Sequence, residues 1–255
     1  MKKVSKMMAY LLAIVMLFTL ASCAKSDNKS SVERIKEAGK IVMSTNAAFE
    51  PFEYIDGDDY AGIDIDLAEK IAEELGVELV INNVEFKALV TELQTGKCDF
   101  VAAGMSYDED KAKNIDFCDG YYNASQSIIV PIDSDIQGAE DLDGKKIGVQ
   151  LGTTGATYCE EDVKDAEISY MDSAVEAVQD LLAGRLDAVV VDNFPAEKLV
   201  EKNSDQIKML DKPLTEEEYM MAVPKGDEAL KEVINKVLKD LKDSGEFDEI
   251  VGKYM

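Results

Sequence analysis

Several small, polar or acidic residues stand directly after short apolar runs of this chain. They are Asn46, residues 104–106 (GMS), residues 152–154 (GTT) and Asp192. In open α/β sheets, ligands bind beyond the carboxyl ends of the strands, so residues at these positions can face one pocket. Amide, hydroxyl and carboxylate groups together suit a small charged molecule. Because GTTG fits neither a P-loop nor GxGxxG, we do not expect a phosphate cradle.

Asp192 itself has two interpretations. It ends the apolar run 188–191, so its carboxylate can bind a cation at the end of a strand. It can equally be the N-cap of the next helix, because aspartate is a leading cap residue. The spacing alone favours neither.

The absence of histidine narrows the chemistry. It excludes Ser-His-Asp and Cys-His catalysis and any histidine-ligated metal site. Cys98, Cys118 and Cys159 form no CxxC or other metal-like spacing. Buried free thiols are favoured over a single disulfide, because buried cysteine packs as a small hydrophobe. We expect no metal and no cofactor.

The N-terminus predicts the compartment. Three lysines precede an apolar run, Met7 to Leu20, that is too short for a comfortable transmembrane helix and is typical of a secretory signal. The run ends in Leu-Ala-Ser-Cys23, which resembles the lipobox of bacterial lipoproteins. We predict a signal peptide over 1–22, a lipid on Cys23 and a polar tether over 23–31, which place the protein outside the cytoplasm on the outer face of the membrane. An ordinary signal peptide with a chance cysteine is the alternative.

Strands and helices alternate after the tether. Apolar residues from Ile63 to Leu75 recur at helical spacing before Gly76, and a second stripe from Phe86 to Leu93 stops at Gly96. Strands are predicted at 40–44, 77–81 and 100–103. This alternation predicts an α/β fold with a mainly parallel sheet and helices on its faces.

Part of the pattern recurs later in the chain. Residues 93–103 (LQTGKCDFVAA) match residues 181–191 (LLAGRLDAVVV), with the glycine displaced by 88 residues from 96 to 184. Residues 40–43 (KIVM) are likewise echoed at 146–149 (KIGV). A long-period echo indicates two lobes of similar architecture, whose strand ends would face each other across a cleft. Chance similarity between α/β units is the alternative.

The net charge excludes one class of partner. The chain has 27 basic and 52 acidic residues, a formal charge of −25, and removal of residues 1–22 takes away three lysines and no acids, leaving −28. Such a polyanion cannot displace counterions from phosphates, so no nucleic-acid partner is expected.

The folded part resembles a known family, the polar amino-acid-binding proteins of ABC transporters (bacterial solute-binding family 3). Residues 62–75 (GIDIDLAEKIAEEL) are similar to its signature, a glycine followed by alternating acidic and aliphatic residues and an amphipathic helix. The resemblance extends over nearly everything after the tether, at 49–54 (FEPFEY), 115–122 (IDFCDGYY), 141–145 (DLDGK), 223–226 (VPKG) and 245–250 (GEFDEI). It implies a periplasmic-binding-protein-like fold of two lobes joined by two crossovers. Lobe one would comprise 32–121 and 220–255, and lobe two 122–219.

The resemblance also implies a ligand site. Phe49 and Phe86 would flank the ligand side chain, although helical spacing makes core packing at least as good an interpretation for Phe86. Gly104 and Ser106 would meet the α-amino and α-carboxylate groups. Thr153 and Thr154 would present a helix N-terminus to the carboxylate, and Asp192 would accept from the ammonium.

Two positions depart from the family's usual pattern. Lys111 stands where an arginine is usual, so the positive charge remains but the planar guanidinium that can bind a carboxylate with two hydrogen bonds is absent. The alternative is that Lys111 lies on the solvated surface of a helix. Asn46 stands where some relatives carry an acid near the ligand side chain. A neutral amide weakens the case for a lysine or arginine ligand and mildly favours a neutral polar one.

The function implied is that of a monomeric binding protein. It would close its lobes around an amino acid and deliver it to a membrane permease with a cytoplasmic ATPase. One alternative is an enzyme like the cyclohexadienyl (prephenate) dehydratases, which share the fold and would use a carboxyl group as general acid. The other alternative is the ligand-sensing domain of a receptor.

Overall fold

The computed structural model describes residues 29–255. The predicted signal peptide, Cys23 and most of the predicted tether lie outside these residues. Helix α2 (Ser31–Ala38) starts the fold with a capping box, in which Ser30 Oγ accepts from the Glu33 amide and the Glu33 carboxylate accepts from the Ser30 amide. Among the described residues, the first helix therefore begins at Ser31, one residue before Val32, where lobe one was expected to start.

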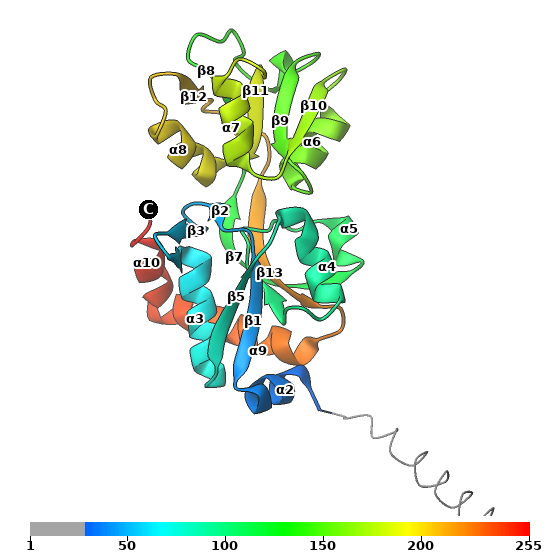
Figure 1. Ribbon diagram of the computed structural model, residues 1–255, viewed down its shortest axis with the longest axis vertical. Coiled ribbons are helices and arrows are strands. Elements are labelled where there is room, and N and C mark those ends of the chain that lie inside the picture. The colour runs from blue at the N-terminus through cyan, green and yellow to red at the C-terminus, as the bar shows by residue number, and fades with distance from the viewer. Residues whose placement is uncertain (1–28) are drawn as a thin grey trace, which may run out of the picture.

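The chain forms two lobes, one above the other in Figure 1, each built on a five-stranded sheet. The sheet of lobe one has the order β5-β1-β6-β13-β7, with strands β1 (Lys40–Thr45), β5 (Glu78–Asn83), β6 (Phe100–Val101), β7 (Ile115–Ala124) and β13 (Glu217–Pro224). The sheet of lobe two has the order β10-β9-β11-β8-β12, with strands β8 (Gln126–Pro131), β9 (Lys146–Gln150), β10 (Glu167–Met171), β11 (Ala188–Asp192) and β12 (Ile207–Met209).

Both sheets are mixed, so the expectation of mainly parallel sheets was wrong. Strand β1 runs parallel to β5 and β6, but β13 runs antiparallel to β6 and β7. In lobe two, β9 runs parallel to β10 and β11, and β8 runs antiparallel to β11 and β12. Each sheet gains two antiparallel pairings from strands next to the passages between the lobes. Apolar periodicity carries no information on strand direction, so it could not reveal this.

Two long strands of lobe one lead to its partner lobe. The chain leaves β7 and enters β8 after Ser125 alone, and it returns from β12 to β13 through residues 210–216. Figure 1 shows β13 reaching from lobe one to the level of lobe two. The predicted lobe boundaries at 121/122 and 219/220 fall inside β7 and β13.

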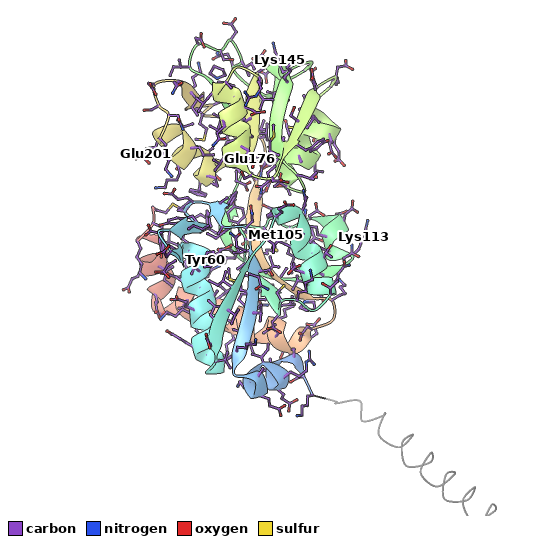
Figure 2. All side chains as sticks on the ribbon, viewed as in Figure 1. Tyr60, Met105, Lys113, Lys145, Glu176 and Glu201 are labelled. Carbon is purple, nitrogen blue, oxygen red and sulfur yellow. The ribbon has the colours of Figure 1, made fainter. Side chains whose placement is uncertain are left out.

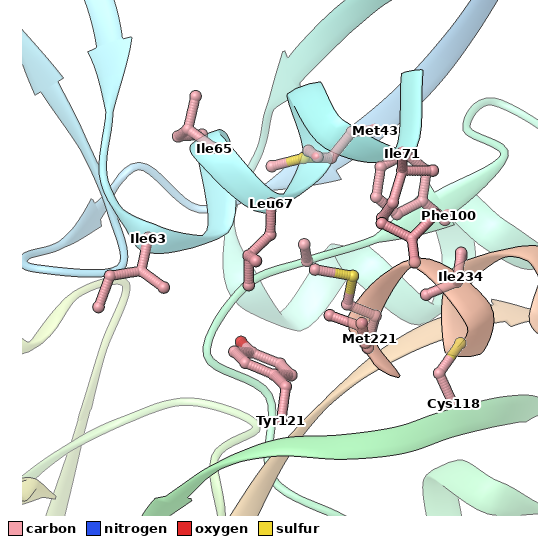
Figure 3. Packing of buried hydrophobic residues seen from close by; sticks show 14 of the residues in the cluster. Met43, Ile63, Ile65, Leu67, Ile71, Phe100, Cys118, Tyr121, Met221 and Ile234 are labelled. Atoms are coloured by element: carbon pink, nitrogen blue, oxygen red, sulfur yellow. The ribbon is translucent and has the colours of Figure 1, made fainter. Parts of the chain in front are cut away.

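The helices of lobe one cover its sheet as their apolar spacing predicts. Helix α3 has the predicted bounds (Ile63–Leu75) and ends at Gly76, which has a left-handed φ of 70°. Leu67 and Ile71 of α3 pack with Met221 of β13 and Ile234 of helix α9 (Glu228–Ser244) in one core (Figure 3). The remaining elements of lobe one are the hairpin strands β2 (Ala48–Phe49), β3 (Glu53–Asp56) and β4 (Asp59–Ala61), with η1 (Phe86–Ala88), α4 (Leu89–Gln94), α5 (Glu109–Ala112) and α10 (Glu246–Val251).

Lobe two has its own helices and two further cores, one on each face of its sheet. The helices of lobe two are η2 (Ala139–Asp141), α6 (Thr154–Asp162), α7 (Ala174–Leu182) and α8 (Asn193–Glu201). Among residues 29–255, no helix has both the length and the apolar character needed to cross a membrane.

The sequence echo corresponds to a repeated structure. Gly96 and Gly184 follow α4 and α7 with φ of 67° and 70°. The next aspartates make the same contact: Asp99 Oδ2 accepts from the Val42 amide of β1, and Asp187 Oδ2 accepts from the Lys146 amide of β9, both at 2.8 Å. In each lobe, the aspartate that follows the glycine therefore joins the segment entering one strand to the backbone of the neighbouring strand.

The three cysteines of the described chain are buried and free, which confirms the preference for thiols over a disulfide. Burial raises the pKa of Cys98 to about 11 and those of Cys118 and Cys159 to about 12. Since the thiolate is the reactive form, these side chains act as core residues.

Candidate functional site

A small cavity lies between the two lobes, where the carboxyl ends of their strands meet. Eight of the nine predicted ligand residues line it: Phe49, Phe86, Gly104, Ser106, Lys111, Thr153, Thr154 and Asp192. Met105 and Gln150 complete the lining. Figure 2 labels Met105 at the end of lobe one that faces lobe two. Gly104, Ser106, Thr153, Thr154 and Asp192 were predicted from their places at strand ends, and Phe49, Phe86 and Lys111 from the family resemblance.

Phe49 and Gly104 form a close contact in lobe one. Gly104 has a φ of +49°, and a Cβ at this position would lie 2.4 Å from Phe49 Cε1. The backbone amide of Gly104 donates to Asp64 Oδ2 at 2.9 Å. Both the backbone angle and the ring above it require glycine here, so the loop after β6 presents its backbone to the cavity. Phe86, half-buried in η1, adds a second aromatic ring to the wall.

Lys111 reaches the cavity from the short helix α5. Asp108 caps this helix by accepting from the Lys111 amide at 2.7 Å, and Asp108 Oδ2 lies 3.2 Å from Lys111 Nζ. Only 17% of the Lys111 side chain is exposed. The structure thus brings the ammonium to the cavity wall, with an acidic partner, and not to the solvated face that was the alternative.

The N-terminus of helix α6 forms the facing wall in lobe two. Thr153 is its N-cap: its Oγ1 accepts from the Ala156 amide at 3.2 Å and donates to the Gln150 carbonyl at 2.9 Å. Thr154 is the first helical residue. The amides of a first turn have no partner within their helix, and they carry the positive end of the dipole, so this wall suits a carboxylate.

Asp192 is the buried anion of the site. It precedes α8 but makes no side-chain capping hydrogen bond within the described chain; its Oδ1 accepts instead from Tyr219 Oη at 2.7 Å. Burial, and then the charge of Glu217, raise the pKa of Asp192 to about 7, while the hydrogen bonds from Tyr219 and Gln126 oppose this shift. Of the two interpretations that the sequence left open, the contacts favour a carboxylate turned to the cavity.

Asn46, the ninth predicted residue, is not among the residues that line the cavity; it contacts the lining residue Gln150 and joins the lobes. Its Nδ2 donates to the Val84 carbonyl and its Oδ1 accepts from Gln150 Nε2, both at 2.9 Å. Gln150 also donates to the Asp172 carbonyl at 2.9 Å. In this arrangement the Asn46 amide bridges lobe one to lobe two.

Two carboxyl groups beneath the site were missed by sequence reasoning. Asp64 Oδ1 accepts from Tyr121 Oη at 2.7 Å, and burial raises its pKa to about 6, against the hydrogen bonds from Tyr121 and Gly104. Glu53 is fully buried, and neither of its oxygens accepts a hydrogen bond from residues 29–255. Burial, and then the charge of Asp64, raise the pKa of Glu53 well above its usual value, so the fold favours the protonated form of this carboxyl beside Asp64.

Gln150 and Glu217 were also missed. Gln150 ends strand β9, so the strand-end argument could have included it. Glu217 lies in a run of three acids, residues 216–218, and nothing in their spacing distinguishes it. Only the folding of β13 between the lobes brings its carboxylate to Ser106 and Thr154.

Direct contacts also join the lobes on either side of the cavity. Lys87 of lobe one pairs with Asp172 of lobe two at 2.8 Å, and Lys202 of lobe two pairs with Glu50 of lobe one. Gly152 of lobe two also lies against Lys87: a Cβ there would be in ordinary van der Waals contact, 3.5 Å from Lys87 Cα. The lobes are closed on one another, and the cavity is enclosed between an anion, a cation, a helix N-terminus and two aromatic rings.

Comparison with known proteins agrees with this geometry. Residues 41–255 match the family model of bacterial extracellular solute-binding proteins, family 3. In Bacillus subtilis, the arginine-binding extracellular protein ArtP is 32% identical, covering 98% of this chain and 97% of its own. The ABC transporter glutamine-binding protein GlnH of the same organism is also 32% identical, covering 96% of each chain.

Two solved structures are similar over most of this chain. The arginine-bound form of truncated ArgBP from T. maritima is 39% identical, with a TM-score of 0.77, over 82% of this chain and 99% of that one. The ancestral amino acid-binding protein AncCDT-1, a precursor of cyclohexadienyl dehydratase, is 35% identical, with a TM-score of 0.82, over 88% and 99%.

Proposed function

Because the chain belongs to the bacterial extracellular solute-binding proteins, family 3, we propose that it is the extracytoplasmic substrate-binding component of an amino-acid ABC importer. The observation that carries this proposal is the pairing of opposite charges in one interlobe cavity. Asp192 offers an acceptor for an α-ammonium, and Lys111 with the first turn of α6 offers donors for an α-carboxylate. A zwitterion satisfies both sets together.

Binding and closure are one process in this proposal. Asp192, Thr153 and Thr154 belong to lobe two, whereas Gly104, Ser106 and Lys111 belong to lobe one. A ligand that contacts both sets favours the closed state over the open one, because only the closed state makes all the contacts. The permease, with its cytoplasmic ATPase, would receive the closed form, and the lipid on Cys23 would keep a monomeric protein at the membrane.

The side chain of the ligand is proposed to be neutral and polar. The support is Asn46, an uncharged amide in contact with the lining residue Gln150, and the similarity to a glutamine-binding relative. Arginine is the second candidate, because Phe49 and Phe86 offer ring faces on which a planar guanidinium stacks. The similarity to the arginine-binding relatives supports the same candidate.

We propose ligand binding as the function, in preference to dehydratase catalysis or receptor sensing. One observation would also fit the dehydratase alternative, because a carboxyl with the pKa of Asp192, about 7, has the acidity that a general acid needs. However, Asp192 lines the cavity with its Oδ1 already accepting from Tyr219, and a carboxylate held in this way suits an ammonium acceptor. The solved structure associated with a dehydratase is itself that of an amino acid-binding protein.

Thermal unfolding with a ligand panel tests the function. The purified protein is unfolded and refolded to remove ligand, then heated with each of the twenty amino acids, cystine and prephenate. A ligand at a hundred times its dissociation constant adds about 2.7 kcal/mol to the free energy of unfolding, and raises the melting temperature by several degrees. A shift with glutamine or another neutral polar amino acid supports the first candidate, and a shift with arginine supports the second. A shift with prephenate alone would replace transport by catalysis.

A further inference from the structure

The carboxylate of Glu217 collects hydroxyl groups from both lobes. Its Oε2 accepts from Ser106 Oγ in lobe one and, at 2.8 Å, from Thr154 Oγ1 in lobe two. The same oxygen accepts from Gln126 Nε2 at 3.4 Å, and Oε1 accepts from Thr215 Oγ1 at 2.7 Å. Glu217 is the first residue of β13, the strand by which the chain returns to lobe one.

These contacts decide the polarity of two hydroxyls in the cavity wall. A hydroxyl has one hydrogen to donate, and those of Ser106 and Thr154 are directed at Glu217. Thr154 Oγ1 also accepts from Gln126 Nε2 at 3.2 Å, which leaves it one acceptor position. Toward the cavity, both oxygens can therefore only accept. Together with Asp192 they make three acceptors, and an ammonium has three hydrogens to donate.

We propose that Glu217 is a positioning residue of the binding site, which holds Ser106 and Thr154 as acceptors for the ammonium of the ligand. The inference rests on the proposed function and goes beyond it, because it assigns the ammonium three acceptors and gives one residue control over two of them. It also links recognition to closure. Ser106 and Thr154 lie on different lobes, so one carboxylate oxygen reaches both only while the lobes are closed.

Replacement of Glu217 by methionine tests the proposal with little change of length. Glutamine would be unsuitable, because its carbonyl oxygen can take the place of Oε2 and still accept from both hydroxyls. Methionine has no carboxylate oxygen, so the hydroxyls of Ser106 and Thr154 are free to turn and direct their hydrogens elsewhere, which removes acceptors from the site. Glu216→Met is the matched control, because it makes the same substitution at the exposed neighbouring residue. The probes are L-glutamine and L-arginine, each paired with its analogue without the α-amino group, 4-carbamoylbutanoic acid and 5-guanidinopentanoic acid.

Calorimetric titration of each protein with each pair gives the result. We expect Glu217→Met to weaken binding of the amino acid about tenfold or more and to change binding of its analogue by less than about threefold. Glu216→Met should change neither. Equal weakening for amino acid and analogue, as a general structural role would produce, overturns the proposal, and so does an unchanged affinity for both.

Two further measurements keep the result interpretable. Melting temperatures of the ligand-free proteins show whether Glu217→Met folds. The Ser106→Ala/Thr154→Val protein removes both hydroxyls and should show the same selective loss, and adding Glu217→Met to it should have no further effect. An additional loss on top of the double variant overturns the proposal. If the unaltered protein binds no amino acid, the proposed function fails and this inference fails with it. If it binds and Glu217→Met has no effect, only this inference fails.

Discussion

Carboxylate and hydroxyl groups surround Asp192, and the charges near it set its pKa. Burial removes water from the carboxylate, and the charge of Glu217 adds repulsion, so its pKa rises to about 7. An incoming ammonium does the opposite, because it stabilises the ionised form. Ligand binding and proton release at Asp192 are therefore coupled.

Affinity for the amino acid should fall as the solution becomes more acidic than pH 7. Below the pKa of free Asp192 the ligand must displace a proton, so we expect a loss of about tenfold for each pH unit between pH 7 and pH 5. Asp192→Asn should bind about 10- to 100-fold more weakly at pH 8. That variant should also show a flat profile over the same range. Titration calorimetry of both proteins measures this, and parallel pH profiles for the two would contradict it.

The buried pair of Glu53 and Asp64 affects stability by the same logic. Because the pKa of Glu53 in the folded protein lies well above its value in the unfolded chain, the folded state holds the proton more tightly. The contribution of this group to the free energy of unfolding is full below about pH 4 and is lost as the pH rises through its folded-state pKa.

Glu53→Gln should remove that dependence. Its amide donates to Asp64 without needing a proton from solution, so the variant should gain stability relative to the unaltered protein from pH 5 to pH 8. Urea unfolding at each pH gives the difference. Glu69→Gln, at an exposed position of α3, is the control and should keep a constant offset. If the difference in the free energy of unfolding between Glu53→Gln and the unaltered protein is also independent of pH, then Glu53 has the same pKa in the folded and unfolded states.

Helix α6 is the element that connects local sequence to ligand binding. Its N-cap, Thr153, and the first residue, Thr154, both line the cavity, so the unpartnered amides of the first turn face the ligand. Helix α7 has a similar cap at Ser173, whose side chain accepts from the Glu176 amide, but Ser173 is not part of the cavity lining. Comparison of these two caps therefore distinguishes the effect of losing a helix cap from the effect of losing a ligand contact.

Thr153→Ala and Ser173→Ala should each lower the free energy of unfolding by about 1 kcal/mol, the usual effect of losing a cap. Only Thr153→Ala should also weaken ligand binding, because it loosens the turn that presents the amides. Denaturant unfolding and titration of both variants test this pair. Equal affinities for the two would show that the first turn of α6 is not part of the site.

At the scale of the whole molecule, contacts between the lobes hold the cleft shut. The pairs Lys87–Asp172 and Lys202–Glu50 flank the cavity, and Asn46 bridges to Gln150 across it. The two ion pairs are solvent-exposed, so water and salt screen them and each has a small effect. Even a small change in interaction energy shifts the equilibrium when the open and the closed state are similar in energy.

Lys87→Met/Lys202→Met should favour the open state of the ligand-free protein. We expect a larger radius of gyration in solution scattering and an affinity lower by no more than a few-fold. Lys236→Met/Lys239→Met removes as many charges from pairs within lobe one and should leave the radius unchanged. An equal change in the two proteins would point to net charge and not to closure.

Local features of the sequence were sufficient for the elements and for most of the cavity wall. The spacing of apolar residues and the position of Gly76 predicted the bounds of α3. The predicted strand ends supply six residues of the cavity lining, Gly104, Met105, Ser106, Thr153, Thr154 and Asp192, whereas Phe49, Phe86 and Lys111 were predicted only through the family resemblance. These features succeed because a helix stripe, a left-handed glycine and the end of a strand depend on a few consecutive residues.

Strand direction, the place of Asn46 and the roles of Glu53 and Glu217 were decided by the tertiary structure alone. The mixed sheets arise from strands that run between the lobes, and Asn46 finds its partner, Gln150, 104 residues further along the chain. Glu217 reaches Ser106, 111 residues before it, because β13 passes between the lobes. Such contacts depend on how two lobes close, and burial sets the protonation of Glu53, so no local pattern of residues can encode either.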